Sequence, residues 1–249
     1  MAFKDHFSGH ASAYARYRPD YPPELFDHLA TLTPRHELAL DCATGSGQAA
    51  VGLARHYKCV IATDGSVAQL RSAQAHPHVA YLGNLAEQPA LKDQSVDLAA
   101  AAQAAHWFDH ARFHSEMRRV LRPDGALAIW TYGLAFVEPQ IDAVVRYYYD
   151  DVVGPYWPPE RRHVENAYRD LPFPWHEVTV PQFQLRLDWT LDDFIGYVGT
   201  WSATQRYTKV SGADPLPSLR AEIAPLWGAN TRPVVWPLHL RVGRPLEKR

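Results

Sequence analysis

The chain has 249 residues, of which 47% are hydrophobic, and its formal net charge at pH 7 is -2. This length allows one large hydrophobic core, or a domain with a sizeable insertion. The near-neutral charge argues against a nucleic-acid-binding protein, which needs a concentrated basic face, so we expect a small-molecule partner. No apolar stretch approaches the ~18 residues of a membrane span, and the N-terminus lacks the apolar segment of a signal peptide, so we expect a cytoplasmic protein.

The first half of the chain alternates short strands with helices. Apolar runs of strand length lie at residues 38–42, 59–63, 79–82, 96–102 and 126–131. Between them, "PPELFDHLATL" and "ARFHSEMRRVL" place apolar residues at helical spacing. This order predicts an α/β fold with a doubly wound, mainly parallel sheet. No repeat or linker divides the chain, so residues 1–249 are expected to form a single domain.

The sequence after Trp130 is rich in aromatic residues and prolines, as in "YYYDDVVGPYWPPERR" and "LPFPWHEVTVP". We interpret residues 133–185 as an irregular insertion that forms a lid over the ends of the sheet, although additional core aromatics would give the same pattern. Three further elements follow. "FQLRLDW" alternates like a strand, "TLDDFIGYVGTW" predicts a helix capped by Thr190, and "VVWPLHLRVG" predicts a final strand.

A glycine turn follows the first predicted strand in "LALDCATGSGQAA", residues 38–50. In a doubly wound sheet, ligands bind at the carboxyl ends of the strands, where this turn lies. Gly45 and Gly47 allow the backbone to approach a ligand closely. Asp64 ends the second strand, where a carboxylate can accept both hydroxyls of a ribose. These features predict a cofactor that contains a nucleoside.

The glycines alone leave the identity of this cofactor open. "GSGQAA" also fits the fingerprint of NAD-dependent oxidoreductases, whereas a P-loop is excluded because no Gly-Lys-Ser/Thr follows. Asp41 lies four residues before Gly45, where it would repel a pyrophosphate but could hold a cationic amino group. An oxidoreductase would also need a catalytic pair such as Tyr-Lys, which is not evident. A module that binds the cofactor without catalysis is a further alternative.

Four consecutive motifs resemble those of class I S-adenosylmethionine-dependent methyltransferases: "LALDCATGSGQ", "ATDGS", "GNLAEQPALKDQSVDLAAAAQAAHWF" and "MRRVLRPDGALAIW". "FSGHASAYARYRPDYP" and "WPLHLRVGR" are similar to the subgroup that includes trans-aconitate methyltransferases. The resemblance covers residues 5–132 well, and residues 133–232 carry little of it. It implies a Rossmann-like methyltransferase fold with seven strands, the last antiparallel at the edge. It also implies methyl transfer to a small molecule, with a carboxylic acid as one candidate.

The resemblance further implies which residues bind S-adenosylmethionine. The methionine part is expected to lie against Asp41, Ala43, Gly45 and Gly47, and the ribose against Asp64, Gly65 and Ser66. The adenine is expected to lie against Leu85, Ala86 and Glu87, and the sulfonium above Gln103. Two of these depart from the family pattern. Ala43 stands where a glycine is frequent, and Leu85 stands where an acid often contacts the adenine.

His106, in "QAAHWF" just past the fourth strand, is the candidate catalytic base. An amine, phenol or thiol acceptor could require a base, whereas a carboxylate, with a reference pKa of ~4, would not. A packing role for His106 is an equal alternative. His106, His110 and His114 recur every four residues, but Asp109 is expected to cap a helix that begins after His106, so no metal is expected.

Two segments combine aromatic residues with arginines. Residues 1–20 contain Tyr14, Arg16, Tyr17 and Arg18 and could fold over the cofactor as a lid, although a surface arm is the alternative and is favoured for Arg16. "WSATQRY" repeats the combination late in the chain. The residues expected to bind the acceptor are Tyr14, Arg18, Trp107, Trp201 and Arg206. The two cysteines, Cys42 and Cys59, lack CxxC spacing and are expected to be buried free thiols.

Overall fold

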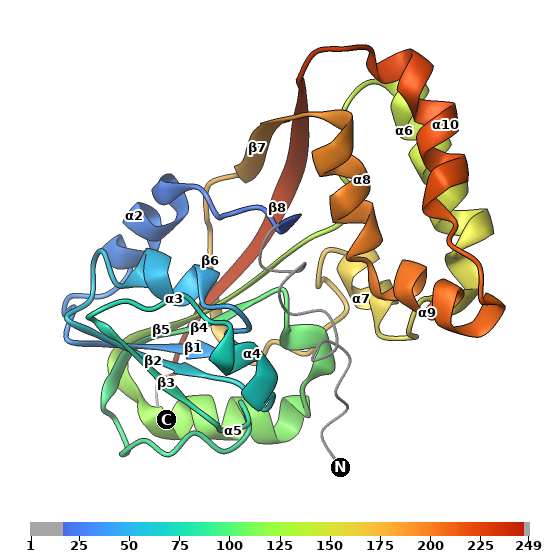
Figure 1. Cartoon of the computed structure of the whole chain (residues 1–249). Coiled ribbons are helices and arrows are strands. Elements are labelled where there is room, and N and C mark those ends of the chain that lie inside the picture. Colours follow the sequence, from blue (N-terminus) through green and yellow to red (C-terminus); the bar gives the residue numbers. More distant parts are fainter. Residues whose placement is uncertain (1–16, 247–249) are drawn as a thin grey trace.

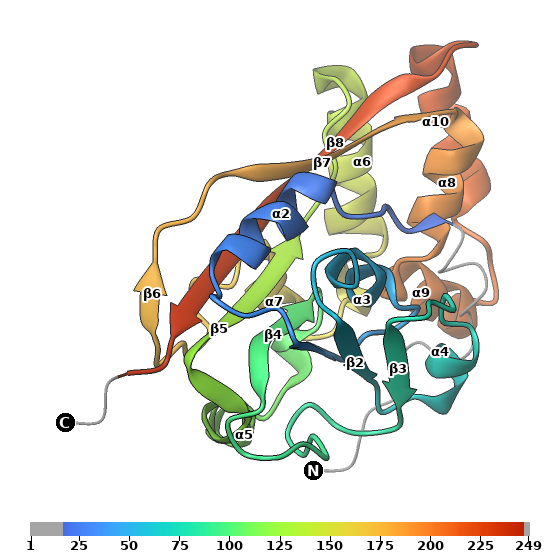
Figure 2. The ribbon, with the colours of Figure 1, turned by 90° about the vertical axis from the view of Figure 1, so that its left-hand side faces the viewer.

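The structure is a computed structural model that describes residues 17–246, shown from two directions in Figures 1 and 2. Its elements in chain order are α2 (Pro23–Thr31), β1 (Leu38–Cys42), α3 (Gln48–Leu53), β2 (Cys59–Thr63), α4 (Val67–Arg71), β3 (Val79–Leu82), β4 (Val96–Ala102), η2 (Ala105–Trp107), α5 (His110–Val120), β5 (Leu121–Tyr132), α6 (Pro139–Tyr147), η3 (Tyr148–Val152), η4 (Gly154–Tyr156), α7 (Arg161–Glu165), β6 (His176–Val178), β7 (Phe183–Trp189), α8 (Leu191–Gly199), α9 (Ser202–Ser211), α10 (Leu216–Trp227) and β8 (Arg232–Arg244). No helix in this part of the chain is long and apolar enough to cross a membrane.

Eight strands of the described chain form one sheet, in the order β3-β2-β1-β4-β5-β8-β6, and β7 pairs with β8 as well. Neighbours among β1 to β5 are parallel, whereas β8 is antiparallel to β5, β6 and β7. The predicted doubly wound α/β fold is therefore confirmed, as are the five parallel strands and the two late ones. Two details differ from the prediction. The sheet has eight strands rather than seven, and β8 is not at the edge because β6 and β7 pair with its far side.

Both faces of the inner strands β1 and β4 are buried, as helices on the two sides require, whereas the edge strand β3 is partly exposed. Successive residues of β1 alternate between the faces: Ala39 belongs to one hydrophobic cluster and Leu40 to the other. Helices α2 and α3 cover the first face, where a Cβ on Gly52 would collide with the ring of Phe26. Helix α5 covers the second face through Phe113 and its apolar neighbours. This packing confirms the two amphipathic helices predicted on either side of the sheet.

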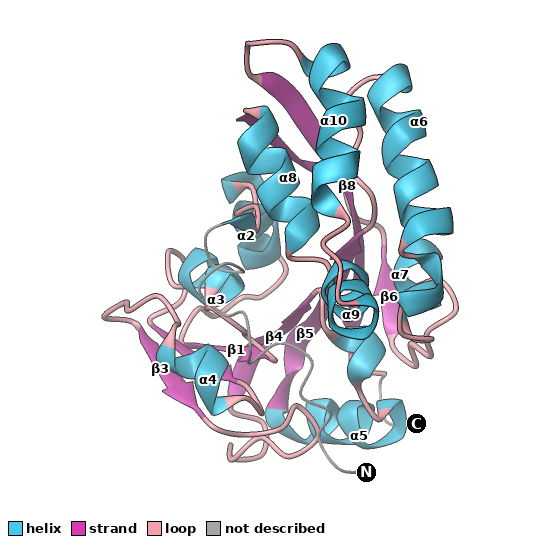
Figure 3. Cartoon of the chain, turned by 45° about the vertical axis from the view of Figure 1, so that its right-hand side comes forward, coloured by secondary structure: helices cyan, strands magenta, loops and turns pink. Residues whose placement is uncertain are grey.

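The segment 133–185 is more regular than the sequence suggested, since it forms α6, η3, η4, α7 and β6. Its aromatic residues divide between two roles. Tyr148 and Tyr149 are 3% exposed and belong to the core, whereas Trp157 and Arg161 line a pocket. Helix α10 packs against α6 and α8, and α9 packs against η4. Figure 3 shows these helices grouped beside the sheet, and they bring the late part of the chain toward the ends of β4 and β5.

Candidate active site

The turn after β1 has the backbone conformation that its glycines suggested. Gly45 and Gly47 have φ values of +57° and +88°, and Ala43, which is not a glycine, also adopts a positive φ of +53°. The N–H of Thr44 donates to the carbonyl of Thr63 at 2.8 Å and so fixes the turn against β2. The methyl group of Ala43 is therefore accommodated in a conformation that usually favours glycine.

Asp41 lies fully buried at the end of β1, below this turn. Its Oδ2 accepts a hydrogen bond from the hydroxyl of Thr44, whereas Oδ1 has no hydrogen-bond partner within residues 17–246. Burial raises the pKa of Asp41 to about 7, an effect that the Thr44 hydrogen bond opposes and the nearby Asp64 carboxylate increases. A buried carboxylate with an unpaired oxygen is stabilised by a cation. The site therefore fits a ligand that carries a positively charged amino group.

Asp64 follows β2 and connects the turn after β1 with the turn after β2. Its Oδ2 accepts from the N–H of Gly45 at 2.9 Å, and its Oδ1 accepts from the N–H of Ser66 at 2.7 Å. Ser66 in turn caps α4, because its hydroxyl accepts from the N–H of Gln69. Gly65 lies exposed between them. A carboxylate offers about four acceptor sites, so these two backbone contacts are compatible with a further role in ligand binding.

The ends of β2 and β3 expose apolar side chains. Val67 is 57% exposed and Leu82 is 38% exposed. Leu85 is half-buried beyond β3, Ala86 is buried, and Glu87 is engaged through Oε1, which accepts from the N–H of Asp109 at 2.9 Å. Such a surface suits the flat face of an aromatic base. Sequence reasoning identified the residues after β3 but missed Val67, whose signal was an apolar residue directly after the Asp64 turn.

A pocket lies beyond the carboxyl ends of β4 and β5. It is lined by residues from widely separated parts of the chain, namely Arg18, Gln103, His106, Trp107, Gly133, Trp157, Pro158, Arg161, Tyr197, Trp201 and Ser202. Five residues that the sequence singled out meet here: Arg18, Gln103, His106, Trp107 and Trp201. The pocket therefore joins the predicted sulfonium position to most of the predicted acceptor residues.

Gln103 is fixed at the floor of this pocket. Its Nε2 donates to the carbonyl of Tyr132 at 2.9 Å, and its Oε1 accepts from the hydroxyl of Thr131 at 2.6 Å and from the N–H of Tyr132 at 2.9 Å. The backbone of Gln103 has a positive φ of +56°. These contacts lock the ends of β4 and β5 together, so the pocket floor is rigid.

His106 lies on η2, and its Nδ1 is 2.7 Å from the hydroxyl of Tyr168. Burial lowers the pKa of His106 to about 3, and the positive charge of Arg161 lowers it further. The imidazole is therefore neutral at pH 7. A group with this pKa is a weak base, which argues against the role of catalytic base that the sequence suggested for His106.

Arg161, at the start of α7, is the charged pocket residue that the sequence analysis did not single out. Its guanidinium stacks over the rings of Trp157 and Tyr149, at 4.6 and 5.3 Å from the ring centroids. Its Nε donates to the hydroxyl of Tyr149 at 2.6 Å, and that hydroxyl donates to Glu165 at 2.6 Å. The available signal was the pairing of Trp157 with an arginine in "WPPERR", the same combination that drew attention to Arg18.

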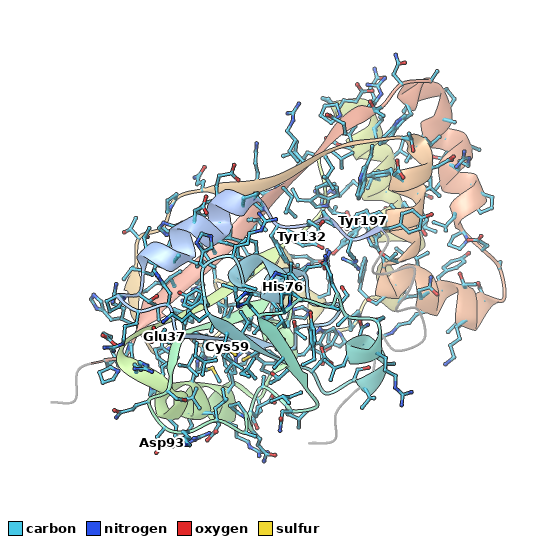
Figure 4. All side chains as sticks on the ribbon, turned by 60° about the vertical axis from the view of Figure 1, so that its left-hand side comes forward. Glu37, Cys59, His76, Asp93, Tyr132 and Tyr197 are labelled. Carbon is cyan, nitrogen blue, oxygen red and sulfur yellow. The ribbon has the colours of Figure 1, made fainter. Side chains whose placement is uncertain are left out.

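Arg18 reaches the pocket from the N-terminal side. Its guanidinium lies 5.5 Å from the ring centroid of Tyr197, and Nη1 donates to the hydroxyl of Tyr132 at 3.4 Å. Figure 4 labels these two tyrosines, which lie where the sheet meets α8. Gln48, the residue after the glycine turn, donates through Nε2 to the carbonyls of Arg18 and Pro19. The chain at Arg18 is thus tied to both the turn and the pocket.

Other predicted residues lie elsewhere. Tyr14 and Arg16 fall outside the described residues, as does most of the predicted lid 1–20. Arg206 is not brought to the pocket lining, since its Nη1 donates to the carbonyl of Tyr156 at 3.4 Å. Trp201, one helical turn earlier, does line the pocket. Of these two candidate residues, Trp201, the residue before α9, lines the pocket and Arg206 does not.

The histidines at 106, 110 and 114 do not form a common site. Asp109 caps α5 as predicted, accepting from the N–H of Arg112, so His106 precedes the helix. His114 is engaged on both ring nitrogens, by Trp175 and by the carbonyl of Pro172. No cluster of three or more His, Cys, Asp or Glu suited to a metal ion occurs in residues 17–246.

The two cysteines are free thiols, as expected. Cys42 is buried and Cys59 is half-buried. Burial raises the pKa of the Cys42 thiol, with additional repulsion from Asp41 and Glu87. Cys42 is therefore an uncharged core residue beside the turn.

Comparisons with known proteins point to one family. Residues 40–129 match the methyltransferase domain family. A protein named as a methyltransferase in Dictyostelium discoideum is 35% identical over 222 residues, which cover 88% of this chain and 84% of that protein. An uncharacterized methyltransferase of Mycobacterium tuberculosis is 39% identical over 124 residues, which cover 49% of this chain and 50% of that protein.

A solved structure agrees over nearly the whole chain. It is described as a type II methyltransferase from Anaeromyxobacter dehalogenans and is 45% identical, with a TM-score of 0.86 over 92% of this chain and all of that one. The sequence relatives, the domain match and the fold favour S-adenosylmethionine over the NAD-dependent alternative. The chain belongs to the class I S-adenosylmethionine-dependent methyltransferases.

Proposed function

We propose that the chain binds S-adenosylmethionine across the carboxyl ends of β1, β2 and β3 and methylates a small carboxylic acid in the pocket beyond β4. The observation that carries the acceptor class is the charge of that pocket. Arg18 and Arg161 line it, and no Asp or Glu is among its lining residues in the described chain. An arginine that is stacked and already oriented recognises a planar anion such as a carboxylate.

The cofactor part of the proposal follows the chemistry of each group. Asp41 offers its unpaired Oδ1 to the amino group of the methionine moiety, and Asp64 accepts the ribose hydroxyls. Val67 and Leu85 flank the adenine, with Ala86 and Glu87 beside it. When bound, S-adenosylmethionine supplies a methyl group on a positively charged sulfur, which becomes a neutral sulfide after transfer.

In this reaction the protein must orient the acceptor and exclude water. A carboxylate is already ionised at neutral pH, so one of its oxygens can form the new bond to the methyl group as the bond from sulfur breaks, and no proton moves. A base is not needed. The low pKa of His106 supports this account, because the imidazole would be ineffective in deprotonating an amine or phenol.

The subgroup that includes trans-aconitate methyltransferases is part of the proposal: the motifs at the two ends of the chain resemble those of that subgroup, and a pocket with two arginines suits an anionic acceptor. Gln48, beside the glycine turn, donates to the carbonyl of Arg18, and residues 1–16, which make up most of the expected lid, lie outside the described residues. The names of the relatives do not specify an acceptor.

Replacement of Arg161 tests the acceptor class. A hydrogen bond to a charged group contributes about 1.5–3 kcal/mol, so Arg161→Gln should lower kcat/KM for the acid about ten- to a hundredfold. The affinity for S-adenosylhomocysteine, measured by calorimetry, should be unchanged. Arg162→Gln is the matched control, because its side chain is exposed and outside the pocket lining. Equal activity in the two variants would contradict the proposal.

A further inference from the structure

Tyr168 is held in an unusual backbone conformation next to the proposed acceptor pocket. It is fully buried, and both Ala167 and Tyr168 have positive φ values, +54° and +60°. Its N–H donates to the carbonyl of His163 at 2.8 Å, and its own carbonyl accepts from Nη1 of Arg241 at 2.8 Å. A bulky residue in the left-handed region persists only where its surroundings determine it, which points to a role for the side chain.

The hydroxyl of Tyr168 has one short side-chain contact, at 2.7 Å from Nδ1 of His106. The direction of this hydrogen bond follows from the other groups around the oxygen. Burial raises the pKa of Tyr168, and hydrogen bonds with the side chain of Thr131 and with the backbone of His106 and Ala105 oppose this effect. Backbone N–H groups can only donate, so they occupy the acceptor side of the phenolic oxygen.

The phenolic proton then has two acceptors within reach, Oγ1 of Thr131 and Nδ1 of His106. The hydroxyl of Thr131 donates to Oε1 of Gln103 at 2.6 Å, so toward Tyr168 its oxygen acts only as an acceptor. Nδ1 is favoured, because an imidazole nitrogen is a stronger acceptor than a hydroxyl oxygen, a phenol is a stronger acid than a neutral imidazole N–H, and the 2.7 Å contact is the one made to Nδ1. Tyr168 therefore donates and Nδ1 of His106 accepts.

We propose that Tyr168 is a positioning residue that places the imidazole proton of His106 on Nε2 and thereby makes His106 a hydrogen-bond donor to the methyl acceptor. Because Tyr168 is outside the pocket lining and His106 is part of it, the ring edge that carries Nε2 is the one left for the pocket. This inference rests on the proposed function, since it concerns how the acceptor carboxylate is held.

In this arrangement, Nε2–H of His106 donates to one oxygen of the carboxylate, and Arg161 supplies positive charge beside it. The second oxygen is then directed toward the methyl group, with which it forms a bond as the carbon–sulfur bond breaks. His106 keeps its proton throughout. The opposite tautomer, in which Nδ1–H donates to Tyr168, would present a bare Nε2 to the pocket and would suit a base.

Nitrogen-15 NMR of histidine-labelled protein distinguishes the two tautomers without any substrate. The signals of His106 are identified by their loss in His106→Gln. The proposal predicts a protonated Nε2 and an unprotonated Nδ1 at pH 7 in the wild-type chain. In Tyr168→Phe, the signals should move toward the average of the two tautomers. A protonated Nδ1 in the wild-type chain would overturn the proposal, whether or not the variant folds.

Kinetics provide a second readout. Loss of one hydrogen bond of about 0.5–1.5 kcal/mol should lower kcat/KM for the acceptor about two- to tenfold in Tyr168→Phe, mainly through KM. Tyr57→Phe is the matched control, since it removes a hydroxyl that is equally buried and bonded to Thr33 at 2.8 Å, away from the pocket. Unaltered kinetics in Tyr168→Phe would contradict the proposal.

The two proposals fail in different ways. A chain that does not methylate acids at all contradicts the proposed function, whereas the NMR result still decides the tautomer. Conversely, if the chain methylates an acid and His106 carries its proton on Nδ1, the proposed function is supported and the role of Tyr168 is contradicted.

Discussion

The hydroxyl of Tyr168 lies 2.7 Å from Nδ1 of His106, although the two residues are 62 positions apart in the chain. His114 makes a comparable contact, because Nε1 of Trp175 donates to its Nδ1 at 2.9 Å. Nε2 of His114 is engaged by the carbonyl of Pro172, whereas His106 lines the pocket. The two histidines are held alike, and only His106 is placed to contact a ligand.

Substitution of His106 should separate a donor from a base. The side-chain amide of glutamine can donate near the position of Nε2–H but cannot act as a base. His106→Gln should therefore retain several-fold more activity than His106→Ala, about two- to tenfold on the scale of one hydrogen bond. Initial rates at saturating cofactor provide the comparison. Equal and nearly complete loss in both variants would favour general-base catalysis.

The pH dependence of kcat/KM provides an independent test of the same group. Burial lowers the pKa of His106 to about 3, so the imidazole stays neutral from pH 5 to pH 9. The profile for an acid substrate should therefore show no inflection near the ordinary histidine pKa of ~6.5. A rise in activity through that pH, abolished in His106→Gln, would contradict this expectation.

Binding of the cofactor should depend on pH through Asp41. Its pKa is raised to about 7 by burial, and a cationic amino group would favour the ionised form. Affinity for S-adenosylhomocysteine should rise as pH increases through about 7, with release of a fraction of a proton on binding. Calorimetry in buffers with different ionisation enthalpies measures this release. If the Asp41→Asn variant released the same fraction of a proton on binding, the proton would come from another group.

Replacement of Asp64 should weaken cofactor binding and loosen the turn. Asp64→Ala removes the acceptor of the Gly45 and Ser66 N–H groups as well as the proposed ribose contact. At about 1.5–3 kcal/mol for hydrogen bonds to a charged group, affinity should fall about ten- to a hundredfold. Asp27→Ala, on an exposed side chain of α2, is the control. Unchanged calorimetric affinity in Asp64→Ala would exclude this assignment.

The parallel part of the fold could be predicted because its signal is local. Each strand from β1 to β4, and the second half of β5, is a short apolar run, because the inner strands of a parallel sheet are buried on both faces. The short strand β6 could not be found in this way. It consists of His176, Glu177 and Val178, two of which are exposed, and only its pairing with β8 makes it a strand.

The candidate site was only partly predictable for a related reason. Asp41 and Asp64 follow strands whose ends meet in space, so their juxtaposition can be inferred from the order of elements. Arg161 and Tyr168 come from the segment between β5 and β7, and their approach to His106 depends on how that segment packs. Periodicity contains no information about such long-range contacts.

The chemical nature of the methylated product tests the central claim most directly. The chain is incubated with S-adenosylmethionine that carries a tritiated methyl group, together with a panel of mono- and dicarboxylic acids and size-matched amines, phenols and thiols. The account predicts that label enters an acid as a methyl ester, which mild alkali cleaves to volatile tritiated methanol. Label that enters only amines, phenols or thiols, in a form stable to mild alkali, would contradict it.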